Sequence, residues 1–139
     1  MSTYYIIRKA ETNAADISIC SDGIIRVIFK KNTEINPQVF EELFKKYNEI
    51  IEGKKYAYLY TVEEDTVTLT DEGRKYAKKN EHVYPKICNA VAVESLTYRL
   101  FANFYLKFNQ PNDPYKVFNN ICEAENWCYL QLMNSGILN

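Results

Sequence analysis

Ile17 and Ile19 alternate with Ser18 and Cys20 before Ser21-Asp22-Gly23, and the run from Ile24 to Lys30 after it is rich in β-branched residues. A period of two is typical of strands, and an Asp-Gly pair between two such runs favours a hairpin, because the turn requires a positive φ. The pattern predicts antiparallel strands over residues 15–20 and 24–30. Residues 1–13 contain a short apolar run, Tyr4 to Ile7, and are interpreted either as an edge strand or as a loose terminus.

Further along the chain, apolar residues recur at helical spacing, each time after a residue suited to an N-cap. The predicted caps are Asn36 (followed by Pro37), Thr70, Ser95 and Asn120, and the apolar runs 56–62, 87–93 and 115–118 are the predicted strands. Gly73 weakens the helix after Thr70. Residues 63–68 are interpreted as a polar connection.

Strands that alternate with helices imply a largely parallel sheet, to which the opening hairpin adds an antiparallel strand. The predicted order is β-β-α-β-α-β-α-β-α. The 139 residues lie within the usual size of one domain. The sequence therefore predicts one α/β domain over residues 1–139, with a mixed β-sheet and helices packed on it.

Composition narrows the class of protein. Lys and Arg total 17 and Asp and Glu total 18, and this balance argues against a nucleic-acid partner. Cys20, Cys88, Cys122 and Cys128 form no C-x-x-C pair, so we expect reduced, mostly buried thiols and a cytoplasmic protein. No apolar run is long enough to span a bilayer, and none resembles a signal peptide.

The C-terminal half carries a run that resembles the SpoIIAA-like branch of the STAS fold, the fold of anti-sigma-factor antagonists. The matching residues are Ala90-Val91-Ala92-Val93, Ser95-Leu96, Arg99 to Lys107, Pro114, Lys116-Val117-Phe118 and Ala124 to Trp127. The topology is also similar to that of the CRAL-TRIO lipid-binding domains grouped with this fold. The resemblance implies a regulatory or ligand-binding domain without catalytic activity.

Phosphorylated STAS regulators carry a Ser at the start of their second helix, in an Asp-Ser-Ser-Gly turn. Thr70 occupies the similar place here, although residues 66–73 lack that signature. A phosphate on Thr70 would meet the free N–H groups of a helix N-terminus. A plain N-cap is the favoured interpretation, because the adjacent Asp71 and Glu72 would repel added charge.

The predicted helix 96–108 is apolar on almost every side, so it must bury more than one face. Its apolar residues include Leu96, Tyr98, Leu100, Phe101, Phe104, Tyr105 and Phe108. Three interpretations stay open: a helix between sheet and final helix, a homodimer surface, or the wall of an apolar pocket. Arg99, Asn103 and Lys107 form a polar row that is either a solvated face or an anion-facing one.

No motif in the sequence indicates catalysis, a metal site or a cofactor. His82 is the only histidine, and Asp113, Glu123 and Glu125 would need a shared cleft to act as paired carboxylates. We therefore expect a non-catalytic cytoplasmic domain that acts through protein–protein interaction, as a homodimer or with another protein. The alternative is a carrier of a small apolar ligand or lipid.

Overall fold

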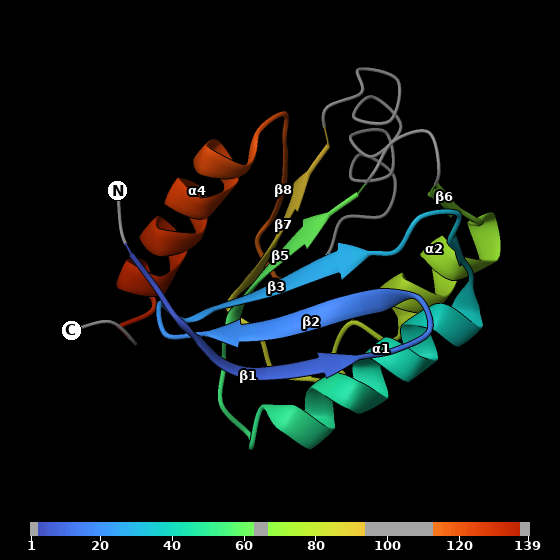
Figure 1. The fold of residues 1–139 in the computed structure, drawn as a ribbon, viewed down its shortest axis with the longest axis horizontal. Coiled ribbons are helices and arrows are strands. Elements are labelled where there is room, and N and C mark those ends of the chain that lie inside the picture. The colour runs from blue at the N-terminus through green and yellow to red at the C-terminus, as the bar shows by residue number, and fades with distance from the viewer. Residues whose placement is uncertain (1–2, 63–66, 94–112, 137–139) are drawn as a thin grey trace.

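The computed structural model describes residues 3–62, 67–93 and 113–136 (Figure 1). Its elements in chain order are β1 (Ile6–Glu11), β2 (Ala15–Cys20), β3 (Ile24–Phe29), β4 (Glu34–Ile35), α1 (Pro37–Ile50), β5 (Ala57–Thr61), β6 (Thr68–Leu69), α2 (Asp71–Lys79), β7 (Cys88–Ala92), β8 (Tyr115–Phe118) and α4 (Ile121–Asn134).

Six of these strands form one mixed sheet in the order β1-β2-β3-β5-β7-β8. The pairs β1–β2 and β2–β3 are antiparallel, whereas β3–β5, β5–β7 and β7–β8 are parallel. The predicted α/β class and mixed sheet are therefore confirmed. The hairpin prediction is also confirmed, with Gly23 at a φ of 88° in its turn. Of the two interpretations left open for the N-terminus, the edge strand holds for Ile6–Glu11.

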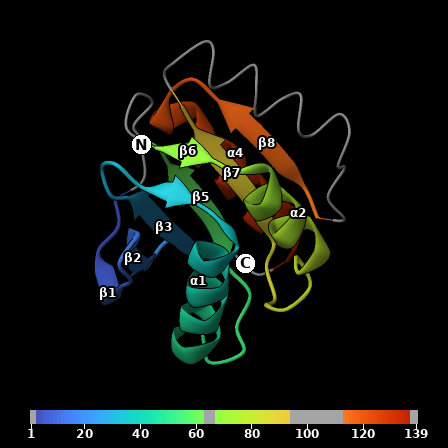
Figure 2. The same cartoon turned by 90° about the vertical axis from the view of Figure 1, so that its right-hand side faces the viewer.

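Helices cover the two faces of the sheet unequally. Figure 2 shows α1 and α2 on one face and α4 on the other. The larger buried cluster lies under α1 and includes Ile17, Val27 and Tyr58, while the smaller one lies under α4 and includes Ile24, Leu59 and Ala90. Alternate side chains of β3 and β5 thus pack in the two different clusters, because successive side chains of a strand point to opposite faces.

The segment before α2 differs from the polar connection that the sequence predicts. Thr68 and Leu69 form a short parallel pair with Glu34 and Ile35, in a second, two-stranded sheet. Strands of two residues are too short to show a periodic pattern in the sequence. The pair holds the start of α2 against the start of α1, and the backbone N–H of Thr70 donates to the carbonyl of Ile35 at 3.1 Å.

This contact explains the glycine inside α2. A Cβ on Gly73 would lie 2.4 Å from the Ile35 carbonyl oxygen and 3.2 Å from Cα of Asn36. Both neighbours are backbone and cannot turn away. The close approach of this backbone therefore explains why a glycine occupies position 73 despite its poor helix propensity.

Four tyrosines form the centre of the larger core: Tyr47, Tyr58, Tyr60 and Tyr84. The Tyr47 hydroxyl donates to the Tyr60 hydroxyl at 3.1 Å, and the hydroxyls of Tyr60 and Tyr84 lie 3.4 Å apart. Burial raises the pKa of all four phenols, so they stay neutral at physiological pH. Only the Tyr58 hydroxyl among these four is buried without a hydrogen-bond partner.

We expect Gly73→Ala to destabilise the protein by about 2 kcal/mol, because the new methyl group must displace backbone. The usual effect of this substitution inside a helix is a gain of about 1 kcal/mol. Urea unfolding measures the difference. Lys75→Ala on the exposed side of α2 is the control, and a Gly73→Ala variant as stable as that control would contradict the packing argument.

The tyrosine cluster yields a matched pair of substitutions. Tyr58→Phe removes an unpaired hydroxyl and should leave the free energy of unfolding unchanged or raise it by up to about 1 kcal/mol. Tyr60→Phe removes the hydroxyl that joins Tyr47 and Tyr84 and should lower it by about 1 kcal/mol or more. Thermal or urea unfolding tests the order of the two variants, and the reverse order would refute this account of the cluster.

Candidate interaction surface

Arg26 of β3 is the centre of an ion cluster between the sheet and α4. Its guanidinium donates to both carboxylate oxygens of Asp22, at 3.2 and 3.0 Å, and twice to Glu125 of α4, at 3.2 and 2.6 Å. The Tyr129 hydroxyl donates to Asp22 at 2.8 Å. The Arg26 and Asp22 side chains are only 12% and 8% exposed. The cluster therefore ties the β2–β3 turn to two positions of α4.

The electrostatics of the cluster favour one fixed charge state. Burial disfavours the charged form of Arg26, but hydrogen bonds to Asp22 and Glu125 outweigh it and raise the pKa of Arg26 above its ordinary value. Burial and the bond to Asp22 raise the pKa of Tyr129 to about 12. All three guanidinium nitrogens of Arg26 donate to carboxylates, which leaves this side chain unsuited to binding an anionic ligand.

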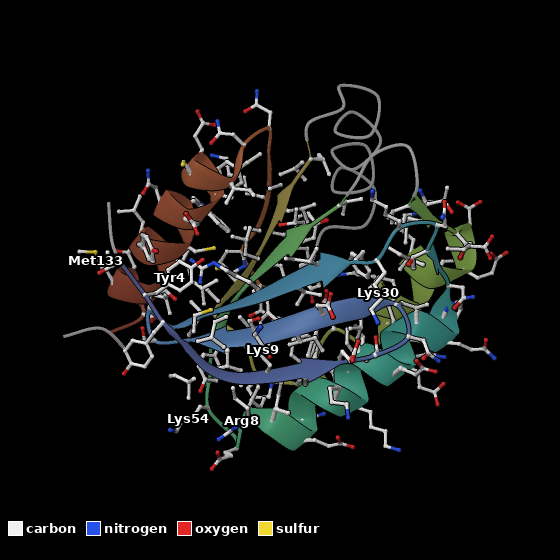
Figure 3. All side chains as sticks on the ribbon, viewed as in Figure 1. Tyr4, Arg8, Lys9, Lys30, Lys54 and Met133 are labelled. Carbon is white, nitrogen blue, oxygen red and sulfur yellow. The ribbon has the colours of Figure 1, made fainter. Side chains whose placement is uncertain are left out.

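The same arginine holds the N-terminal segment. The Tyr4 ring lies 3.6 Å from the guanidinium carbon of Arg26, in a cation–π contact. The next residue, Tyr5, donates its N–H to the Ser21 hydroxyl at 3.0 Å and accepts from the Ser21 N–H at 2.8 Å. Figure 3 shows Tyr4 and Met133 at the same end of the molecule. The segment before β1 is therefore fixed on the β2–β3 turn.

Strand β1 is an edge of the sheet, and none of its residues is buried. Thr12 donates its N–H to the carbonyl of Ala15 at 2.9 Å. This bond determines which residue pairs between β1 and β2 are hydrogen-bonded, because hydrogen-bonded and non-hydrogen-bonded pairs alternate along antiparallel strands. Arg8 and Ala10 therefore direct their backbone groups toward β2, and Lys9 and Glu11 direct theirs outward. In the part of the chain that the structure describes, no strand pairs with this outward side.

Large apolar side chains are exposed beside this edge. They are Tyr5 (70% exposed) just before β1 and Ile6 and Ile7 at its start. A cluster of exposed aliphatic and aromatic residues beside an open strand is typical of a protein–protein contact. We call β1 with these side chains the β1 surface.

The charged residues of β1 point to different faces of the sheet. Arg8 lies opposite Ile19 and is bonded to the Ile50 carbonyl and to Glu52 at the end of α1. Lys9 lies opposite Ser18, on the face that carries α4 elsewhere. Glu11 shares that face and forms a 2.8 Å ion pair with Lys30. In Figure 3, Arg8 is labelled near the end of α1, away from Lys30.

Thr70 is the N-cap of α2, as the sequence predicts. Its hydroxyl accepts from the Gly73 N–H at 2.9 Å and donates to the Ile35 carbonyl at 3.3 Å. Asp71 and Glu72 occupy the first turn. The hydroxyl is thus engaged as donor and acceptor, and phosphorylation of Thr70 stays a prediction.

The predicted helix 96–108 lies outside the described residues. The same is true of the apolar residues that the sequence singles out as an interface or pocket wall, and of the polar row Arg99, Asn103 and Lys107. Those interpretations therefore stay predictions. The β1 surface is a different feature, which the sequence indicates only through the short apolar run near the N-terminus.

The three carboxylates considered for acid–base chemistry are separated by their partners. Glu125 belongs to the Arg26 cluster, Asp113 lies 3.6 Å from the amine of Lys86, and Glu123 is exposed. His82 is exposed as well. The structure therefore brings none of these groups together as a pair.

Lys86, which no sequence pattern singles out, is a buried lysine two residues before β7. Its amine donates to the carbonyls of Glu81 and Tyr84 and faces the Tyr84 ring at 4.3 Å. Burial lowers the pKa of Lys86, and Asp113 opposes that effect. Perturbed lysines mark many active sites. Here the amine is occupied by two carbonyls and a carboxylate, which indicates a structural role.

The cysteines are free thiols, as expected. Cys20, Cys88 and Cys128 are buried and Cys122 is exposed. Burial raises the pKa of Cys20, and the hydrogen bond with Cys88 together with burial raises that of Cys128. A raised pKa reduces the thiolate fraction that nucleophilic chemistry requires.

Within residues 3–62, 67–93 and 113–136, no group of three or more His, Cys, Asp or Glu side chains is placed to hold a metal ion. No helix among these residues is long and apolar enough to cross a membrane.

The architecture and surface define an α/β domain that has helices on both faces of a mixed sheet and one exposed antiparallel edge. The chain belongs to the family described as Domain of unknown function (DUF7793), whose model matches residues 18–131. That match spans β2 to α4 and leaves β1 outside it. Neither the curated proteins nor the solved structures contain a match to the chain.

The Arg26 cluster should contribute strongly to stability. We expect Arg26→Met to lower the free energy of unfolding by about 2 kcal/mol, because two shielded carboxylates lose their partner. Urea unfolding monitored by Trp127 fluorescence measures the loss. Lys30→Met, which breaks an exposed ion pair, is the control and should cost less. Equal losses of unfolding free energy for the two variants would show that the Arg26 cluster stabilises the protein no more than an exposed ion pair does.

Proposed function

We propose that this protein is a non-catalytic interaction domain that acts by self-association. The observation that carries the proposal is the β1 surface: an open strand edge flanked by exposed Tyr5, Ile6 and Ile7. Exposed edges with apolar side chains pair readily with other strands. Pairing with a second strand would satisfy the outward backbone groups of β1 and bury these side chains.

The rigidity of the segment supports the same proposal. Tyr4 is held by Arg26 and Tyr5 by Ser21, so the start of β1 is fixed before any partner arrives. Preorganisation reduces the conformational entropy that binding costs. A loose terminus of the same composition would bind more weakly.

The proposal includes a fold relationship to the STAS and SpoIIAA-like domains, which are regulatory modules. Its support is the mixed sheet, in which antiparallel strands precede parallel strands that alternate with helices. The residues of the resemblance that the structure describes run from Ala90 in β7, through Lys116 to Phe118 in β8, to Trp127 in α4. A cytoplasmic location belongs to the same proposal.

The first test is the mass of the protein in solution. We expect a dimer at tens of micromolar, measured by native mass spectrometry and sedimentation. Ile7→Lys should raise the dissociation constant of this dimer at least about tenfold, because a lysine at this position cannot be buried between the subunits as the isoleucine would be. Val83→Lys, at an exposed aliphatic residue after α2, is the matched control. The same spectra would reveal a bound apolar molecule, the alternative that the sequence raised for residues 96–108. A strict monomer at high concentration would refute self-association.

A further inference from the structure

The regular part of β1 is self-complementary. The strand has a register irregularity between Ile6 and Arg8, whereas Arg8 to Glu11 pair with β2 without interruption. Lys9 and Glu11 both direct their backbone groups outward, and their side chains share one face. One strand edge thus presents a positive and a negative side chain two residues apart.

We infer that the strand that covers this edge is β1 of a second copy, paired antiparallel about a two-fold axis at Ala10. This inference rests on the proposed self-association and specifies its geometry. Lys9 then lies opposite Glu11 of the partner subunit, and Glu11 lies opposite Lys9 of the partner subunit. The pairing joins two six-stranded sheets into one continuous sheet.

Charge selects this register over its neighbours. An axis at Lys9 places two lysines opposite each other, and an axis at Glu11 places two glutamates opposite each other. An axis at Arg8 brings two arginines together. Like charges directly opposite one another destabilise an antiparallel pair, and opposite charges stabilise it. Only the axis at Ala10 gives opposite charges at both outward-facing positions.

The monomer leaves the required groups available. Lys9 has no ion-pair partner among residues 3–62, 67–93 and 113–136, and its side chain is exposed. Glu11 is bonded to Lys30, but its side chain is 67% exposed and a carboxylate accepts from two cations. Ala10 is small, which suits the axis, where the two chains approach most closely.

Charge exchange between two variants tests the register. Lys9→Glu alone places two glutamates opposite each other in the homodimer, and Glu11→Lys alone places two lysines opposite each other. Each variant should dimerise about tenfold more weakly than the unmodified protein. Mixing ¹⁵N-labelled Lys9→Glu with unlabelled Glu11→Lys restores opposite charges at both positions. Native mass spectrometry should therefore show predominantly the mixed dimer.

A cross-link provides a second measurement that does not depend on charge. In a Cys122→Ser background, Ala10→Cys should form an intersubunit disulfide on mild oxidation, because directly opposed non-hydrogen-bonded residues lie within disulfide reach. Lys9→Cys is the control, since two residues at position 9 would be offset along the strands beyond roughly 7 Å.

The outcomes separate this inference from the proposal on which it rests. A mixed dimer together with the Ala10→Cys cross-link supports the register. A dimer that persists in both charge variants, shows no preference for mixing and forms no cross-link at position 10 overturns the register while self-association stands. A protein that is monomeric at all concentrations overturns both.

Discussion

The position of the N-terminal strand and of the last helix depends on one partly buried cation. Arg26 bonds Asp22 in the β2–β3 turn and Glu125 in α4, and its face carries the Tyr4 ring. These segments are far apart in sequence. A guanidinium suits the task because its planar fork donates in several directions at once and keeps its charge at every physiological pH. The two carboxylates offset the cost of desolvating it, so the charge joins turn, helix and terminus in a single arrangement.

The β1 surface arises from unequal coverage of the sheet. Helix α4 contacts the parallel strands β5, β7 and β8, and α1 and α2 cover the opposite face. The antiparallel strands β1 and β2 extend beyond α4. An edge strand cannot satisfy its outward backbone groups within the sheet, so water or another strand must do so. The exposed side chains of Ile6 and Ile7 favour another strand, and this preference is the basis of the proposed self-association.

In the described part of this protein, potentially reactive side chains take part in packing and in internal hydrogen bonds. The Lys86 amine is bonded to carbonyls, the buried thiols have raised pKa values, and the core tyrosines bond one another. In each case the low dielectric of the interior favours the neutral form, or a charge whose donors are already occupied. This use of reactive groups in packing supports the proposal that the domain acts through its surface.

Local patterns determined most of the architecture, whereas contacts between distant residues determined the surface. The Asp22-Gly23 turn and the caps Asn36, Thr70 and Asn120 were predicted and confirmed, because each depends on neighbouring residues alone. The sequence could not show that Gly73 faces the Ile35 carbonyl, that β4 pairs with β6, or that Arg26 meets Glu125. The edge position of β1, left open by a short apolar run, was decided by strand pairing. Such contacts join residues tens of positions apart, and only the folded chain brings them together.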